Sequence, residues 1–157
     1  MVELRKIDVK HYPTERAKIL DLAGRIWSRP ESFDNARDSI ERWGNSGNES
    51  GTYFYVIKDD REIGLTGYYV PSLERGDFGL RHHGTVIKGT GKLALDALLK
   101  YLKQAYGSHF RRLIELIPEG REELIPKFEE WGFKLSSDPI PEWEPKRDYY
   151  KYMMVLM

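Results

Sequence analysis

Residues 86–102, with the sequence VIKGTGKLALDALLKYL, place two glycines directly before a strongly amphipathic helix. Gly89 and Gly91 can adopt backbone angles closed to other residues, so successive N–H groups can turn toward one point. The first-turn N–H groups of the helix have no partners inside it, and the aligned peptide dipoles make that end attract anions. Lys88 and Lys92 flank the glycines. The pattern therefore predicts a turn that leads into a helix and offers a phosphate group a cradle of backbone amides.

The same glycines have other interpretations. The run from Gly89 to Ala94 fits G-x-G-x-x-A, the dinucleotide fingerprint, but the repeated strand–helix–strand units and an acidic residue about 20 positions later are missing. A P-loop would need a glycine in place of Val86 and a serine or threonine in place of Leu93. A Gly-x-Gly pair before a helix can also be a tight turn and nothing more. The order of elements around the motif decides between these interpretations.

Composition restricts the classes of protein that are possible. A chain of 157 residues can bury the core of one domain without disulfides or metal ions. The absence of cysteine excludes a thiolate nucleophile and a zinc site with Cys ligands, and no other pattern indicates a metal. The 25 basic and 25 acidic residues balance, so general attraction to nucleic acid or an anionic membrane is not expected. No apolar run approaches the roughly 20 residues of a membrane span, and no signal peptide precedes the first strand, so we expect a cytoplasmic protein.

Hydrophobic periodicity predicts the element order β-α-α-β-β-β-α-β-α-β-β. Strands are expected at residues 2–9, in both arms of a hairpin over 52–71, and at 73–84, 110–117, 133–135 and 149–157. Helices are expected from Pro13 to before Pro30, over 33–43, after the glycine turn and over 122–131, with loops at 45–51 and 137–145. The fold class is α+β: one domain over residues 1–157, with a mixed, mostly antiparallel sheet of about seven strands and helices on both faces.

This order, with a Gly-x-Gly turn between the fourth strand and the third helix, resembles the GCN5-related N-acetyltransferase (GNAT) superfamily over almost the whole chain. The family signature is an arginine or glutamine, two residues, Gly, one residue, then Gly or Ala. Gly89 and Gly91 fill the glycine places, and Val86 stands in the first place. The sequence KFEEWGF, residues 127–133, resembles the family's helix that ends in Gly-Phe before the sixth strand. In many members a tyrosine on this helix protonates the departing thiolate, and Phe128 stands in the matching place.

The resemblance implies a donor and an acceptor. The donor is acetyl-CoA, as a co-substrate, or another acyl-CoA, and the acceptor is a primary amine of a small molecule or peptide. Family members splay the fourth and fifth strands apart, so that backbone groups of the fourth strand bond the pantetheine arm. By spacing from Gly89 these groups belong to Gly79, Leu80 and Arg81. The pyrophosphate is then expected on the following residues: Ile87, Lys88, Gly89, Thr90, Gly91 and Lys92.

Transfer to an amine requires a group that takes the proton of the ammonium. Asp77 stands where several family members carry an acidic base, and His83 is expected to face the same side by strand alternation. Glu115, between two apolar residues, is expected to be partly buried, which would raise its pKa toward that of a working base. Each candidate has a structural alternative: a turn carboxylate for Asp77, a polar strand residue for His83, and an ion pair with Arg111 or Arg112 for Glu115.

Several aromatic side chains allow two interpretations. Tyr68 and Tyr69 could supply the missing acid or belong to the core or to the wall of an acceptor pocket, and His82 is expected to be structural. Two groups of residues could form a cage for an amine, or simply pack and be solvated: Trp27, Arg29 and Phe33, and Trp143 with Glu142 and Glu144.

Two further questions stay open at this point. The last strand is apolar enough to be buried or to meet a second subunit, so a homodimer is one expectation. The alternative function is an acyl-CoA-binding sensor or interaction module with the same fold, which Val86 and Phe128 favour.

Overall fold

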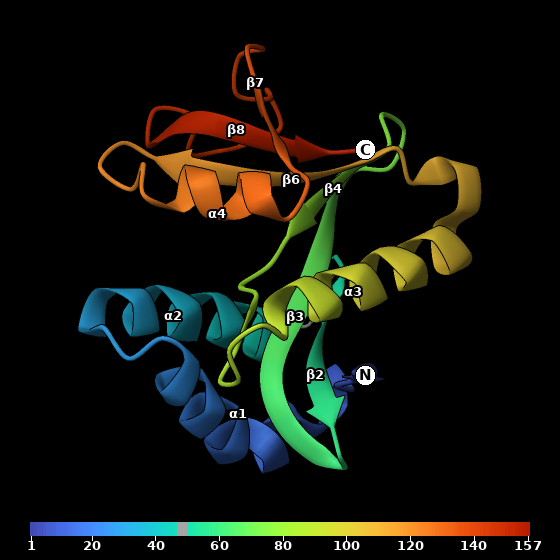
Figure 1. Ribbon diagram of the computed structural model, residues 1–157, viewed down its shortest axis with the longest axis vertical. Helices are drawn as coiled ribbons and strands as arrows, with labels where there is room; N and C mark the ends of the chain where they lie inside the picture. Colours follow the sequence, from blue (N-terminus) through green and yellow to red (C-terminus); the bar gives the residue numbers. More distant parts are fainter. Residues whose placement is uncertain (47–49) are drawn as a thin grey trace. The chain divides into compact units, whose positions relative to one another are not determined.

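The computed structural model describes residues 1–46 and 50–157 and contains the expected elements in the expected order (Figure 1). The helices are α1 (Tyr12–Ile26), α2 (Pro30–Ser46), α3 (Gly91–Tyr106) and α4 (Leu124–Glu130), with short 3-10 turns at Val9–His11 and Gly107–His109. The strands are β1 (Glu3–Lys6), β2 (Thr52–Lys58), β3 (Arg61–Ser72), β4 (Asp77–Leu80), β5 (Gly84–Thr85), β6 (Arg112–Pro118), β7 (Lys134–Ser136) and β8 (Tyr150–Leu156). The expected loop at 45–51 is shorter at its start, because Asn45 and Ser46 are helical, and residues 47–49 lie outside the described residues.

The strands pair in the order β1-β2-β3-β4-β6-β8-β7, and β5 pairs with β3. The β4–β6 pair is parallel, whereas the pairs β1–β2, β2–β3, β3–β5, β6–β8 and β7–β8 are antiparallel. Among the described residues this makes a mixed, mostly antiparallel sheet of eight strands, against about seven expected. The additional strand is β5, whose two residues are too few to give a periodic signal.

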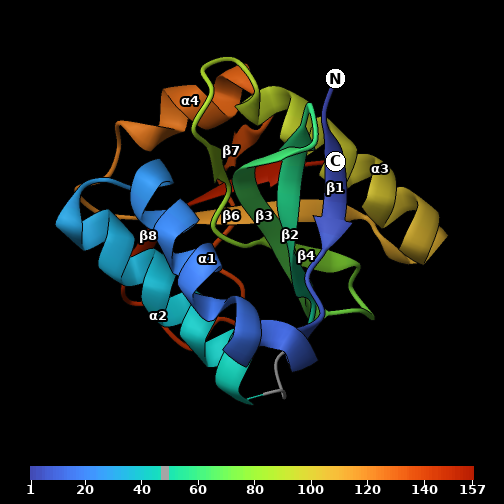
Figure 2. The same cartoon turned by 90° about the horizontal axis from the view of Figure 1, so that it is seen from below.

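The chain forms two compact units, one of residues 1–69 and 81–101 (unit 1) and one of residues 70–80 and 102–157 (unit 2). In unit 1 the side chains of β2 alternate between two cores. Tyr53, Tyr55 and Ile57 pack with α1 and α2, while Val56 packs with Ala94 of α3. Alternate strand residues point to opposite faces, so helices cover both faces of this part of the sheet (Figure 2).

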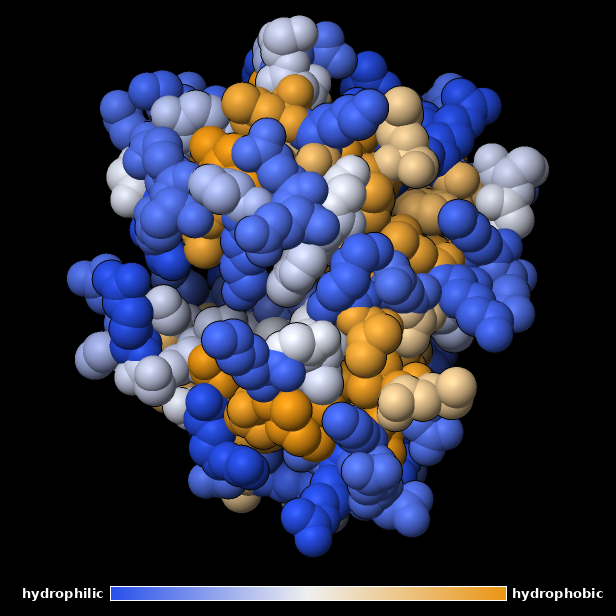
Figure 3. Space-filling model, viewed as in Figure 1, coloured by the Kyte–Doolittle hydropathy of each residue, from blue (hydrophilic) through white to orange (hydrophobic). Residues whose placement is uncertain are grey.

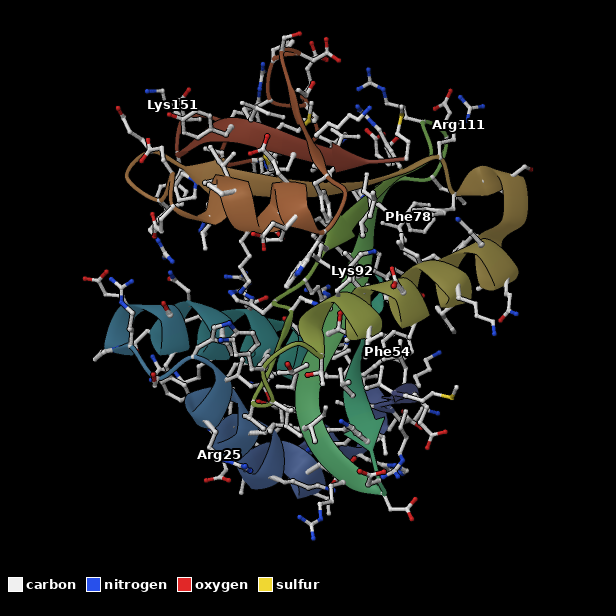
Figure 4. The ribbon with its side chains drawn as sticks, viewed as in Figure 1. Arg25, Phe54, Phe78, Lys92, Arg111 and Lys151 are labelled. Atoms are coloured by element: carbon white, nitrogen blue, oxygen red, sulfur yellow. The ribbon has the colours of Figure 1, made fainter. Side chains whose placement is uncertain are left out.

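The β2–β3 hairpin is the element that the sequence predicts most clearly. Asp59 and Asp60 form its turn, with φ angles of +51° and +61°. Positive φ at both central residues gives the turn a backbone twist that matches the flanking strands, and aspartate tolerates that region better than most residues. On β2, Phe54 faces α3 and meets the ring of Tyr101 edge-on, with 4.9 Å between centroids (Figure 4).

In unit 2, β6 lies between β4 and β8, and β8 pairs with β6 on one side and β7 on the other. Met153 and Met154 of β8 are buried. Ile114 and Leu116 form a core with Met153 on one face. The chain itself buries the middle of the last strand, while the other residues of β8 are partly buried or exposed, and a homodimer stays a prediction.

Within residues 1–46 and 50–157, every helix is either too short or too polar to cross a lipid bilayer.

Candidate functional site

The glycine motif forms a loop of unit 1 that leads into α3. Gly89 has a φ of +85°, and no other atom lies within 4 Å of where a Cβ would stand. Gly91 is the first residue of α3 and has no positive φ. Only the first glycine therefore supplies a left-handed turn, which corrects the expectation that both glycines would use this freedom.

A polar residue between the two glycines closes the loop. Thr90 is 3% exposed. Its Oγ1 lies 2.6 Å from the Ile87 carbonyl oxygen and 2.7 Å from Thr85 Oγ1. Its carbonyl accepts a hydrogen bond of 2.9 Å from the Ala94 N–H, inside the first turn of α3. The loop is thus held from within by side chains of its own segment.

The two lysines of the motif differ in their surroundings. Lys92, in the first turn of α3 (Figure 4), places its Nζ 2.6 Å from Asp96 Oδ1. Lys88 is exposed and has no ion pair among the described residues. Two apolar side chains, Ile87 and Leu93, are 40% and 44% exposed beside them, and Figure 3 shows apolar surface near the start of α3. Of the two lysines, Lys92 is the one with an ion pair, and that pair is exposed.

His83 does not lie on a strand, because β4 ends at Leu80. The prediction that strand alternation places His83 on the same side as Asp77 is therefore wrong. The His83 Nε2 lies 2.9 Å from the Gly91 carbonyl oxygen, and its Nδ1 lies 2.6 Å from Thr66 Oγ1. Because a carbonyl only accepts, Nε2 carries the proton and Nδ1 accepts from Thr66. The ring connects β3 to the first turn of α3, and both nitrogens are engaged.

Arg81 and His82 are also held by their surroundings. The Arg81 N–H donates to the Gly67 carbonyl at 2.9 Å, so the expectation of an unpaired Arg81 amide is corrected. Its guanidinium donates to the carbonyls of Tyr68 and Ser50. The ring of His82 meets Trp27 edge-on, with 5.6 Å between centroids. Burial, together with the charges of Arg81 and Arg42, lowers the pKa of His82 to about 4, so this imidazole is neutral at pH 7.

In unit 2, β4 pairs with β6 over three residues. Their pairing runs from Asp77 and Arg112 to Gly79 and Ile114 and ends there, although β4 continues to Leu80 and β6 to Pro118. Gly79 is the last paired residue of β4, and Leu80 is the first beyond the ladder. The expected splaying of these two strands stays a prediction.

The Asp77 carboxylate is buried and accepts hydrogen bonds from two side chains of unit 2. Its side chain is 1% exposed, and Oδ1 accepts a hydrogen bond of 2.6 Å from Arg112 Nε. Oδ2 accepts from Arg112 Nη2 at 3.2 Å and from Trp143 Nε1 at 2.8 Å. Burial by itself would raise the pKa of Asp77, but these hydrogen bonds outweigh burial and hold its pKa below its usual range. Asp77 lies on β4 and in an ion pair with Arg112, which differs from the turn carboxylate that was the structural alternative.

Replacing Asp77 by asparagine should lower the free energy of unfolding by roughly 3 kcal/mol, because the change leaves the Arg112 guanidinium without its counter-charge. The pKa of Asp77 is lowered in the folded state, so its contribution is present above the usual Asp pKa and lost as pH falls through the folded-state value. Urea unfolding of both proteins at pH 7 and pH 3 measures this. A difference that is equally large at both pH values would contradict the ion pair as the cause.

Glu115 is the first residue of β6 beyond the ladder with β4. Its side chain is partly buried and lies on the same face as Met154, its partner on β8. Among the described residues no cation pairs with it, and Arg112 is instead bound to Asp77. Burial raises the pKa of Glu115 to about 8. The carboxyl group is therefore the one candidate base that is both perturbed and not already engaged by a described partner.

The remaining aromatic residues are mostly packed. Phe128 is 9% exposed, and its ring lies 5.3 Å from that of Phe133, between centroids. Trp143 donates to Asp77 and packs against the core of Ile114, Leu116 and Met153. Glu144 is buried and accepts from the Lys146 N–H. The sequence could not foresee the Asp77–Trp143 bond, because these residues are 66 positions apart.

Comparison with solved structures identifies the fold. The chain superposes on the aminoglycoside acetyltransferase AAC(6')-Ib in complex with coenzyme A with a TM-score of 0.70 and 18% identity, covering 99% of this chain and 94% of that one. It superposes on a chimera of spermidine N-acetyltransferase SpeG from Vibrio cholerae and hSSAT with a TM-score of 0.65 and 14% identity, covering 99% and 94%. It superposes on the PaiA N-acetyltransferase from Thermoplasma acidophilum in complex with coenzyme A with a TM-score of 0.61 and 13% identity, covering 99% of this chain and 98% of that one.

The chain has the fold of the GCN5-related N-acetyltransferases, as its sequence predicts. Neither a protein-family model nor a curated protein matches it.

Proposed function

We propose that this protein transfers an acetyl group from acetyl-CoA to a primary amine. The observation that carries the proposal is the loop before α3, where a glycine with φ of +85° precedes the helix and an exposed lysine lies beside it. A helix N-terminus with such a loop binds phosphate through backbone N–H groups. Two of the solved proteins with this fold contain coenzyme A, which carries a diphosphate.

The donor site follows from the same loop. The diphosphate would be bound by backbone amides and side chains of the loop residues Ile87, Lys88, Gly89, Thr90, Gly91 and Lys92. In unit 2, Leu80 lies beyond the last pair of the β4–β6 ladder, where an extended amide-rich chain could bond to the strand. Gly79, the last paired residue, would mark the start of this segment.

Glu115 is the best-supported candidate for the general base. In the reaction the amine nitrogen bonds to the thioester carbonyl carbon, the C–S bond breaks, and coenzyme A leaves as a thiolate. The proton lost by the nitrogen passes to the Glu115 carboxylate. Asp77 and His83 are engaged in bonds within their own units and are proposed as structural residues. Phe128 has no proton for the thiolate, so the thiolate is released or protonated by solvent.

The acceptor is proposed to be a primary amine on a small molecule or a peptide. Solved proteins with this fold are named for acetylating aminoglycosides and spermidine, which supports an amine without selecting one.

One of these relatives is a dodecamer, and an assembly of this chain, such as the homodimer, stays a prediction. A cytoplasmic location stays a prediction.

Turnover with a panel of primary amines tests the proposal. Purified protein is mixed with acetyl-CoA and each amine, and released thiol is followed with a colorimetric reagent. We expect thiol release that depends on at least one amine and saturates with acetyl-CoA. Binding of acetyl-CoA without turnover across polyamines, aminoglycosides, amino acids and peptides would contradict the enzyme and favour the acyl-CoA sensor.

A further inference from the structure

Three hydrogen-bond donors surround one carbonyl oxygen in the loop before α3. The Ile87 carbonyl lies 2.6 Å from Thr90 Oγ1, 3.1 Å from Thr85 Oγ1 and 3.3 Å from the Thr90 backbone nitrogen. The two hydroxyl oxygens are themselves 2.7 Å apart. Each hydroxyl has one proton, so one hydroxyl donates to the Ile87 carbonyl and the second hydroxyl donates to the oxygen of the first. Either arrangement satisfies the buried Thr90 side chain.

This arrangement fixes the direction of the next amide. A trans peptide unit is planar, and its C=O and N–H groups point in opposite directions. All described peptide bonds are trans. Because the Ile87 carbonyl points toward the two threonines, the Lys88 N–H points in the opposite direction, away from them. The carbonyl oxygen, which would repel an anion, is held on the inner side.

A second contact holds the other end of the loop. The His83 Nε2–H donates to the Gly91 carbonyl, while its Nδ1 accepts from Thr66 of β3. Gly89, between the two held points, supplies the left-handed turn. Contacts within the chain therefore hold the loop at both ends, and a loop held in its binding conformation loses less conformational entropy when it binds.

We infer that Thr85 and Thr90 are positioning residues that hold the loop in the conformation that binds a diphosphate. The inference rests on the proposed function and concerns the same site. Neither side chain needs to touch the ligand, since each acts by holding the Ile87 carbonyl. In the GNAT signature an arginine or glutamine stands where this chain has Val86, so the affinity for the diphosphate depends more strongly on loop shape here.

The test removes one hydroxyl at constant size. Thr85→Val is compared with Thr85→Ser, which keeps the hydroxyl, and with Thr52→Val, which removes a buried hydroxyl elsewhere in unit 1. Calorimetry measures the Kd for coenzyme A and for pantetheine, which lacks phosphate. We expect Thr85→Val to raise the Kd for coenzyme A about tenfold, which corresponds to the loss of one hydrogen bond. The Kd for pantetheine should change little. Thr85→Ser and Thr52→Val should stay within about twofold. In turnover, Thr85→Val should raise KM for acetyl-CoA and leave kcat unchanged.

The possible results separate this inference from the proposed function. If the unaltered protein binds no coenzyme A, the proposed function fails and this inference fails with it. If the unaltered protein binds and Thr85→Val binds equally well, only the positioning role is overturned. An equal loss with Thr52→Val, or an equal loss of pantetheine, would also overturn it, because a general loss of stability would then explain the effect.

Discussion

Replacing Gly89 by valine should raise the Kd for coenzyme A by about thirtyfold or more while the protein stays folded. The φ angle of Gly89 is +85°, a region that a β-branched residue enters only at a cost of a few kcal/mol. No other atom lies within 4 Å of the place of the new Cβ, so the side chain itself would not clash. The backbone is expected to relax to a negative φ, which turns the loop amides away from the diphosphate and leaves the core unchanged.

Gly107→Val is the matched control. Gly107 also has a positive φ, +57°, and open space around its Cβ position, but it lies in the 3-10 turn after α3. Both variants should have similar melting temperatures, and only Gly89→Val should lose affinity in calorimetry. Unchanged affinity in a folded Gly89→Val protein would show that the diphosphate is not bound by this loop.

Glu115→Gln should change both stability and rate, each with its own dependence on pH. The pKa of Glu115 is raised by burial from 4.5 to about 8. Its contribution to stability is therefore fully present below the unfolded pKa of 4.5 and is lost as pH rises through the folded pKa of about 8. The maximum slope is about 1.4 kcal/mol per pH unit. The glutamine variant avoids this loss, so it should be more stable than the unaltered protein at pH 9 and similar at pH 4.5.

In turnover, Glu115→Gln should lower kcat by a factor of roughly 100 to 10,000, the usual contribution of a general base. The rate of the unaltered protein should rise with pH through about 8, as the carboxylate forms, and this dependence should be absent from the residual rate of the variant. Melting temperatures from pH 4.5 to 9 and initial rates from pH 6 to 9 give both measurements.

Glu119→Gln is the matched control for this substitution. Glu119 follows the end of β6 and its side chain is 78% exposed. Its replacement should change neither the stability curve nor the rate. If Glu115→Gln is stabilised at high pH but keeps its full rate, Glu115 is a buried acid without a catalytic role.

Local pattern was sufficient to predict most of the fold. The β2–β3 hairpin and α3 have strong periodicity and distinct turn residues, and both appear where expected. The partial burial of Glu115 was also predictable, because its neighbours along the strand, Ile114 and Leu116, are apolar. These predictions succeed because they depend on residues close together in the chain.

The rest of the candidate site depends on distant pairing. The role of Asp77 is set by Arg112 and Trp143, which lie 35 and 66 positions away. The direction of the His83 side chain was predicted on the assumption that the strand continues to residue 83. The strand β4 ends at Leu80, and the chain then forms β5, which pairs with β3. The hydroxyl pair of Thr85 and Thr90 had no recognisable signal, because two threonines five positions apart are ordinary until the structure shows that both contact the Ile87 carbonyl.

Calorimetric titration of the unaltered protein with acetyl-CoA tests the central claim most directly. The claim is that backbone amides of residues 87–92 bind the diphosphate of an acyl-CoA. We predict saturable heat with one site per chain, and at least tenfold weaker binding of pantetheine, which lacks the diphosphate. Absence of heat with coenzyme A and acetyl-CoA alike, at concentrations up to about 1 mM, would contradict it.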